Sequence, residues 1–173
     1  MRFVIKLPIR TRRISITHMS AADLKDYEKL ISQPEIAAGA GFNLVSNQKM
    51  LTEVAKRQIS HPMTLGLRIH DHLAGAILLY EQIDQNGFPD EANLEMSYFL
   101  DPVYWNQGFM TEAADQLTQV LKHDPTVKTV NAEVFTDNLA SKALLNRLGF
   151  EMTTTVTDPI IGRKKAIFKL NLA

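Results

Sequence analysis

Apolar and polar residues along the chain follow two different periods, and each change of period marks a predicted element. Alternation predicts strands at 14–18, 64–70, 92–100, 127–135, 151–156 and 165–172, and a nearly continuous apolar run predicts another at 73–80. Apolar residues three and four positions apart predict helices at 21–31, 47–59 and 111–122, and a short one capped by Asp137 or Asn138. We expect residues 1–12 to be a loosely held arm and residues 35–46 to be a mobile loop.

Polar and breaking residues mark several of the element boundaries. Ser20, with Asp23 at the capping-box position, predicts the start of the first helix. Asp71-His72 predicts the tight turn between two strands, and Gly149 sits where a glycine ends a helix. The second helix is expected to bury Met50 in its apolar stripe, and the last helix is expected to bury Ala140.

This order of elements predicts an α/β (α+β) fold. It comprises a single mixed, mostly antiparallel sheet with helices on both faces, formed by one domain over residues 1–173. The β-α-β unit at 93–135 is expected to be a parallel, right-handed crossover.

Composition excludes several classes of function. Lys+Arg and Asp+Glu both number 19, so the formal net charge is zero and predicts neither nucleic-acid nor membrane binding. The chain has no Cys, and its His residues show no ligand spacing, so no metal site is expected. No apolar stretch is long enough for a signal sequence or a transmembrane span, and we expect a cytoplasmic protein.

The stretch 104–113 joins a predicted strand to a predicted helix, with Gly108 in the loop between them. The first N–H groups of a helix lack intrahelical partners and, with the helix dipole, form a site suited to phosphate. Gly108 has no Cβ, so the backbone there can approach a ligand closely. Taken alone, an ordinary connection between a strand and a helix is the commoner explanation of this pattern.

Three segments in this order resemble one known family. They are Glu95-Met96-Ser97-Tyr98-Phe99-Leu100, then Tyr104-Trp105-Asn106-Gln107-Gly108-Phe109-Met110-Thr111-Glu112-Ala113, and finally Asn138-Leu139-Ala140-Ser141 with Arg147-Leu148-Gly149-Phe150. Together they make the chain similar to the GCN5-related N-acetyltransferase (GNAT) superfamily. The closest similarity is to the RimJ/RimL-like branch, which acetylates the N-termini of ribosomal proteins. The resemblance implies the GNAT acyl-CoA N-acyltransferase fold.

The resemblance also implies an activity, namely acetyl transfer from acetyl-CoA, as co-substrate, to a primary amine by direct attack in a ternary complex. The acceptor would be a protein N-terminal α-amine or a small-molecule amine. Glu95 is implied as the general base, and Ser141 is implied to lie near the sulfur. The implied cofactor-binding residues are Tyr98, Phe99, Leu100, Gln107, Gly108, Phe109, Met110, Thr111, Asn138 and Ser141.

These residues divide the implied work between them. Backbone groups at 98–100 would pair with the pantetheine arm, and N–H groups near Phe99 would stabilise the oxyanion. The N–H groups at 107–111 would hold the pyrophosphate.

Several residues keep a second interpretation. Asn138 could simply cap its helix, Glu95 could face solvent, and Trp105 could either shield the cofactor or anchor the loop. The pair Arg12-Arg13 could attract an acidic peptide or a nucleotide phosphate, but a solvated charge pair is the expected state.

Two departures from the family pattern leave room for a second function. Met110 replaces the usual Gly or Ala, and Leu145 replaces a common Tyr. The alternative is therefore a catalytically weak acyl-CoA-binding module with a sensing or scaffolding role. The chain could be a monomer or a homodimer.

Overall fold

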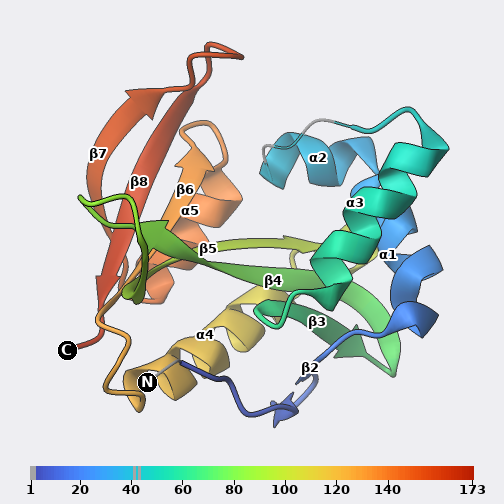
Figure 1. The fold of residues 1–173 in the computed structure, drawn as a ribbon, viewed down its shortest axis with the longest axis horizontal. Coiled ribbons are helices and arrows are strands. Elements are labelled where there is room, and N and C mark those ends of the chain that lie inside the picture. Colours follow the sequence, from blue (N-terminus) through green and yellow to red (C-terminus); the bar gives the residue numbers. More distant parts are fainter. Residues whose placement is uncertain (1–2, 41, 43) are drawn as a thin grey trace. The chain divides into compact units, whose positions relative to one another are not determined.

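Strands and helices form largely where the two apolar periods predict them (Figure 1). The computed structural model describes residues 3–40, 42 and 44–173. The strands in this part of the chain are β1 (Ile9–Arg10), β2 (Ser15–Thr17), β3 (Thr64–Ile69), β4 (His72–Ile83), β5 (Pro89–Leu100), β6 (Thr129–Phe135), β7 (Glu151–Thr157) and β8 (Lys164–Asn171). The α-helices are α1 (Leu24–Ile31), α2 (Pro34–Ala40), α3 (Gln48–Ser60), α4 (Phe109–Lys122) and α5 (Leu139–Arg147).

The strands are hydrogen-bonded in the order β1-β2-β3-β4-β5-β6-β8-β7. β5 and β6 are parallel, with Glu95 opposite Asn131, whereas β2–β3, β3–β4, β6–β8 and β7–β8 are antiparallel. The predicted mixed, mostly antiparallel sheet is therefore confirmed, as is the parallel arrangement of β5 and β6. Their register extends over residues 93–95 of β5, although β5 itself continues to Leu100.

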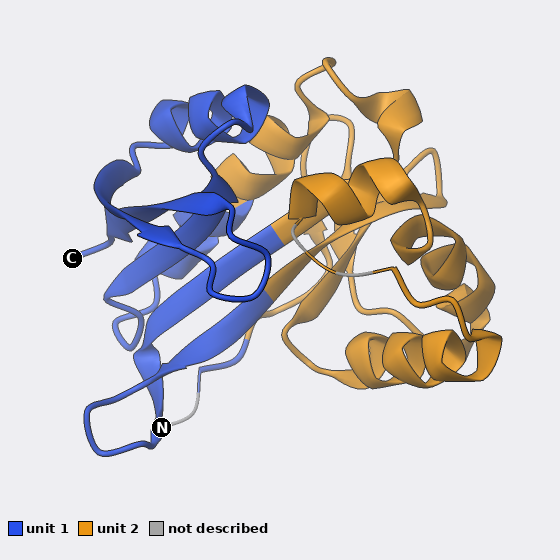
Figure 2. Cartoon of the chain, turned by 90° about the horizontal axis from the view of Figure 1, so that it is seen from above, with its two compact units in different colours: residues 1–4, 79–97, 117–173 blue, residues 5–78, 98–116 orange. Residues whose placement is uncertain are grey.

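Chain contacts divide the protein into two compact units (Figure 2). Unit 1 contains residues 1–4, 79–97 and 117–173, and unit 2 contains residues 5–78 and 98–116. β4, β5 and α4 each contribute residues to both units. That the whole chain is one domain stays a prediction.

Unit 2 is built on an apolar cluster between α1, α3 and the strands. Ser20 caps the chain before α1 through the predicted capping box with Asp23, and α1 then buries Tyr27, Leu30 and Ile31. The same cluster contains Leu51, Ala55 and Ile59 of α3, together with Leu73, Ala76, Leu78 and Phe99. Burying each large aliphatic side chain contributes roughly 1.5–3 kcal/mol, so this cluster is a main source of the stability of unit 2.

In unit 1, alternation gives β5, β6 and β8 one apolar and one polar face. The apolar positions are fully or nearly fully buried, and they include Leu94, Met96, Val130, Ala132, Phe168 and Leu170. Glu95 is in register with Asn131, and Asn131 is in register with Lys169, so these three side chains share the opposite face. The polar face thus collects side chains with acid–base and hydrogen-bonding chemistry.

Two expectations for the first 46 residues are wrong. The segment 1–12 is not a loose arm in its described part, because Phe3, Ile5 and Ile9 are buried and Ile9 pairs with Ile16. The expected loop at 35–46 begins with helix α2, since Pro34 occupies the first helical turn, where its missing N–H costs nothing. Residues 41 and 43 of that expected loop lie outside the described part of the chain.

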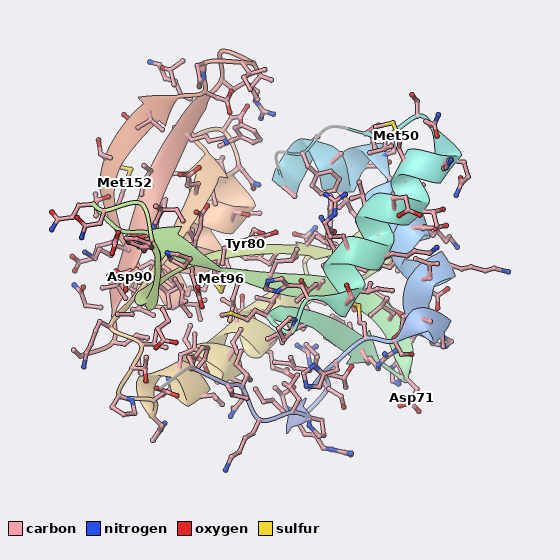
Figure 3. All side chains as sticks on the ribbon, in the orientation of Figure 1. Met50, Asp71, Tyr80, Asp90, Met96 and Met152 are labelled. Carbon is pink, nitrogen blue, oxygen red and sulfur yellow. The ribbon has the colours of Figure 1, made fainter. Side chains whose placement is uncertain are left out.

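Three smaller expectations also differ from the structure. The turn between β3 and β4 lies at His70-Asp71, one residue early, because Ile69 pairs with His72. Both turn residues have positive φ, at 50° and 63°, as a primed hairpin turn requires; Asp71 is labelled in Figure 3. Met50 is 61% exposed on α3, and Ala140 is exposed on α5, so neither belongs to the core.

At Gly75, strand β4 lies very close to the backbone of β5 within unit 2. A Cβ at this position would overlap the carbonyl oxygen of Phe99 and lie 3.0 Å from Cα of Leu100. Because backbone cannot move aside as a side chain can, Gly75→Ala should lower the free energy of unfolding by about 1–3 kcal/mol. At Gly66, by contrast, the added Cβ would meet the flexible Met19 side chain at 2.8 Å. Urea unfolding should show a smaller loss for Gly66→Ala, and equal losses would contradict this account.

Candidate active site

The loop that follows β5 is held to the end of that strand by side chains. The indole Nε1 of Trp105 donates to the carbonyl oxygen of Leu100 at 2.7 Å, and Nε2 of Gln107 donates to the carbonyl of Val103 at 3.0 Å. Asp101 caps the short turn Pro102–Tyr104 by accepting from the N–H of Val103. Of the two interpretations left open for Trp105, the structure therefore shows the anchor of the loop.

Helix α4 begins at Phe109, two residues earlier than predicted, and two of the three residues before it are left-handed. Asn106 has φ of 60° and Gly108 has φ of 78°. Glu112 makes the first intrahelical hydrogen bond, from its N–H to the carbonyl of Gly108 at 3.0 Å. The N–H groups of Phe109, Met110 and Thr111 precede that bond and have no intrahelical acceptor.

The first two side chains of α4 are buried, so the backbone N–H groups of this turn are the groups that can bind a ligand. Phe109 and Met110 are both buried, each 8% exposed, so the Met at the usual Gly or Ala position is accommodated inside the protein. Alternating left- and right-handed residues before a helix form a concave set of N–H donors that suits an anion. The donor set at 107–111 therefore fits a pyrophosphate group.

Glu112, in the first turn of α4, receives three hydrogen bonds from the N-terminal segment. Its carboxylate accepts from Thr11 Oγ1 at 2.5 Å, from the N–H of Arg13 at 2.9 Å and from Nε of Arg13 at 2.8 Å. Burial alone would raise the pKa of Glu112, but these hydrogen bonds and the Arg13 charge outweigh burial and lower it. Arg12 and Arg13 are both exposed, as a solvated pair would be, but Arg13 is in addition ion-paired with Glu112.

Glu95 lies on the polar face of unit 1 and is half-buried there. Burial is the main cause that raises the pKa of Glu95, the negative charge of Glu133 raises it further, and Lys165 opposes both. Lys165 is paired with Glu133 at 3.8 Å and with Asp158 at 3.2 Å. Glu95 is therefore only partly exposed to solvent, and its role stays a prediction.

Tyr80 is a neighbour of Glu95 that the sequence analysis missed. It lies on β4, where Figure 3 labels it, and its hydroxyl hydrogen-bonds to the side chain of Ser97. Burial raises the pKa of Tyr80, the bond to Ser97 opposes this, and the charge of Glu95 raises it again. Gln82, two residues after Tyr80 on β4, accepts a hydrogen bond through its Oε1 from Nδ2 of Asn131 on β6 at 3.2 Å. In the sequence, this part of the site is indicated by the change from apolar to polar residues at the end of the strand, Tyr80-Glu81-Gln82.

Two expected cofactor residues lie at the start of α5 in unit 1. Asn138 is the N-cap of this helix, since its Oδ1 accepts from the N–H of Ser141 at 3.1 Å. Ser141 is half-buried, and no described residue hydrogen-bonds to its hydroxyl. Leu145, at the position of the family Tyr, is fully buried. A binding role for Asn138 and Ser141 stays a prediction.

The remaining expected residues differ in what they can offer. Phe99 packs its ring edge-on against Tyr27 at 5.8 Å and Phe42 at 6.3 Å in the core of unit 2, so only its backbone can meet a ligand. The carbonyl of Leu100 already accepts from Trp105. Tyr98 and Thr111 are half-buried, whereas Gln107 and Gly108 are exposed.

Two kinds of site are not found in the described part of the chain. No three or more His, Cys, Asp or Glu residues there gather closely enough to hold a metal ion. None of its helices is both long and apolar enough to cross a membrane.

The comparisons with known proteins agree with this geometry. A family model described as an acetyltransferase (GNAT) domain matches residues 13–151, which is most of the sequence. The chain belongs to the GNAT acetyltransferase family. This GNAT protein is thus an acetyl-CoA-dependent N-acetyltransferase. No protein of curated function matches its sequence significantly.

Several solved GNAT structures share the fold at low sequence identity. A GNAT-family acetyltransferase from Bacillus anthracis aligns with a TM-score of 0.82 and 13% identity, over 96% of this chain and 99% of that one. The ribosomal alpha-N-protein acetyltransferase RimL, in complex with coenzyme A, aligns at 0.78 and 12%, over 93% and 95%. Spermidine N-acetyltransferase from Vibrio cholerae, with CoA and spermine, aligns at 0.78 and 12%, over 94% and 97%. At these identities the likeness shows the fold alone.

The opposite pKa shifts of Glu95 and Glu112 predict opposite effects of their neutral variants on stability. A carboxyl whose pKa is raised by folding costs stability once it ionises, so Glu95→Gln should be more stable than the parent at pH 7. A carboxyl with a lowered pKa contributes stability when ionised, so Glu112→Gln should be less stable at pH 7. The Glu95 difference should shrink as the pH falls from the raised pKa of Glu95 into the ordinary glutamate range, and the Glu112 difference should shrink as the pH falls from that range to below it. Thermal unfolding at several pH values measures this, and a destabilised Glu95→Gln at pH 7 would contradict it.

Proposed function

We propose that this enzyme acetylates the α-amine of a protein N-terminus, as members of the RimJ/RimL-like branch do, with a small-molecule amine as the second acceptor class. The observation that carries the proposal is the half-buried Glu95 on the polar face of unit 1, beside Tyr80, Ser97 and Glu133. A carboxyl with a raised pKa is a better proton acceptor than an ordinary glutamate at neutral pH.

The charges on this face support an acceptor that carries one amine. Lys165 forms ion pairs with both Glu133 and Asp158, so this face carries positive as well as negative charge. A polyamine carries several positive charges and would favour a cluster of uncompensated carboxylates. The structural likeness does not choose between the two acceptors, because RimL and the spermidine enzyme are each 12% identical to this chain.

The amount of base catalysis that Glu95 must supply depends on the acceptor. A lysine amine, with a pKa near 10.4, costs about 4 kcal/mol to deprotonate at pH 7.5. An α-amine, with a pKa near 7.8, costs well under about 1 kcal/mol. For an α-amine, Glu95 needs only to take the proton that the nitrogen releases as it bonds to the carbonyl carbon, either directly or through a water molecule.

The cofactor residues have separate proposed roles. Bound acetyl-CoA supplies a thioester whose carbonyl carbon the amine attacks, with CoA leaving as the thiol. The N–H groups at 107–111 would hold the pyrophosphate, and the backbone of Tyr98, Phe99 and Leu100 would pair with the pantetheine arm. Because the Leu100 carbonyl is engaged by Trp105, Leu100 would contribute its N–H. An N–H near Phe99 would donate to the oxyanion.

The leaving thiolate needs a proton that Leu145 cannot give, since Leu145 is an apolar core residue. Ser141 is the proposed donor, directly or through water. The same Leu145 is the observation that favours the alternative of a catalytically weak acyl-CoA-binding module. Intact CoA binding without turnover over a panel of peptides and small amines would select that alternative. Location in the cytoplasm and the oligomeric state stay predictions.

Replacing Gly108 tests the pyrophosphate site. Gly108 has φ of 78°, which a β-branched residue adopts only with strain, so Gly108→Val should displace the N–H donors and weaken CoA binding at least tenfold, about 1.4 kcal/mol. Gly87 is a matched control, because it has φ of 85° in the β4–β5 turn with open space around it. Gly87→Val should lose comparable stability and keep its affinity for CoA in calorimetry. Unchanged CoA affinity in Gly108→Val would exclude this cofactor site.

Replacing Glu95 tests the general base. Glu95→Gln should lower kcat/KM for a peptide acceptor by roughly 100-fold or more, because the released proton loses its acceptor. The remaining activity should move to higher pH, where the amine is already neutral. Because the pKa of Glu95 is raised, the acid limb of the parent profile should lie above the ordinary glutamate range. A variant with the parental rate and pH profile would show that Glu95 is not the base.

A further inference from the structure

Arg13 is fixed beside the start of α4 by contacts on three sides. Its Nε and its backbone N–H both donate to Glu112. Its guanidinium carbon lies 4.1 Å from the ring centroid of Phe109. One Nη nitrogen lies 3.5 Å from the place where a Cβ on Gly108 would sit. All of these residues belong to unit 2.

These contacts leave the outer end of the guanidinium available. Nε is used by Glu112, and one face of the group covers Phe109, which in turn packs edge-on against Tyr104 at 5.7 Å. Within the described part of the chain, no residue accepts a hydrogen bond from either Nη of Arg13. A guanidinium held in this way keeps four N–H donors in a fixed plane, which suits an oxygen-rich anion.

The charge of Glu112 makes such a cation necessary at this helix start. Glu112 lies in the first turn of α4 and has a lowered pKa, so it is ionised at neutral pH. An uncompensated carboxylate there would repel a phosphate bound to the N–H groups of the same turn. Arg13 neutralises this carboxylate, and Thr11 donates a further hydrogen bond to it.

We propose that Arg13 is a cofactor-binding residue whose Nη groups donate to a pyrophosphate oxygen of bound CoA while its Nε holds Glu112. This inference rests on the proposed pyrophosphate site at 107–111 and adds a side chain from the N-terminal segment to it. Arginine–phosphate hydrogen bonds are charge-assisted and can be bidentate. The turn that carries Arg13 is itself braced, because the N–H of Thr11 donates to the carbonyl of Ile14 at 2.9 Å.

Calorimetric titration with CoA tests the proposal, with Arg12 as the matched control. Arg13→Gln should weaken CoA binding at least tenfold, whereas Arg12→Gln, with the same change of charge one residue away, should change it less than twofold. Arg13→Lys should recover part of the loss, since a lysine keeps the charge but not the planar fork. Equal effects of the Arg12 and Arg13 variants would overturn the proposal in favour of a general charge effect.

A double-mutant cycle with Glu112 separates direct contact from neutralisation. If Arg13 touches the phosphate, Arg13→Gln must weaken CoA binding in the Glu112→Gln background as well. If Arg13 only screens Glu112, the loss disappears in that background and the proposal fails. Circular dichroism and thermal unfolding of each variant confirm that it is folded before its affinity is compared.

Dephospho-CoA identifies which phosphate is involved. A pyrophosphate contact predicts the same fold-loss on Arg13→Gln for CoA and dephospho-CoA. A loss confined to CoA would overturn the assignment in favour of the 3′-phosphate. The parent protein and Gly108→Val serve as references. If the parent does not bind CoA, the proposed function fails, whereas if only the Arg13 variant binds normally, this inference alone fails.

Discussion

The unpaired N–H groups at the start of α4 are the constraint around which the loop and the N-terminal segment are arranged. A helix must begin somewhere with such groups, and here two left-handed residues precede it. Trp105 ties the loop to the end of β5, and the side chains of Phe109 and Met110 are buried. Glu112, the one residue of this first turn that could repel an anion, is held by Thr11 and Arg13.

Local features of the fold were predictable from the sequence, and long-range contacts were not. Ser20 and Asn138 cap their helices as short-range patterns indicate, and Gly108 has the dihedral that its place before a helix requires. The contact between Arg13 and Glu112 joins residues 99 positions apart, and no local pattern reports it. Likewise, the N–H of Phe3 donates to the carboxylate of Glu91, 88 positions away, and no local pattern in residues 1–12 indicates this contact. The mistaken loop at Pro34 has another cause, because Pro ends one helix and starts the next equally well.

The two glutamates show how one side chain can serve opposite purposes. Glu112 is surrounded by donors, which hold it as a permanent carboxylate with a purely positioning role. Glu95 is half-buried near another carboxylate, so its protonated form is less disfavoured and its pKa is raised, which suits the role proposed for it. Both positions are Glu in the sequence, so residue type cannot predict their opposite pKa shifts. Only the residues that surround each carboxyl on adjacent strands and segments distinguish the two.

Strand β7 ends the sheet, and all seven of its residues are exposed, including Met152, which Figure 3 labels. Its Thr-rich sequence has the high β-propensity that would let another chain continue the ladder and begin aggregation. Between Met152 and Thr154 its register with β8 shifts. Such an irregularity bends and twists an edge strand and interrupts the even row of donors and acceptors that a second strand would need. The register shift therefore makes this exposed edge a less regular template for a second strand than its sequence alone would suggest.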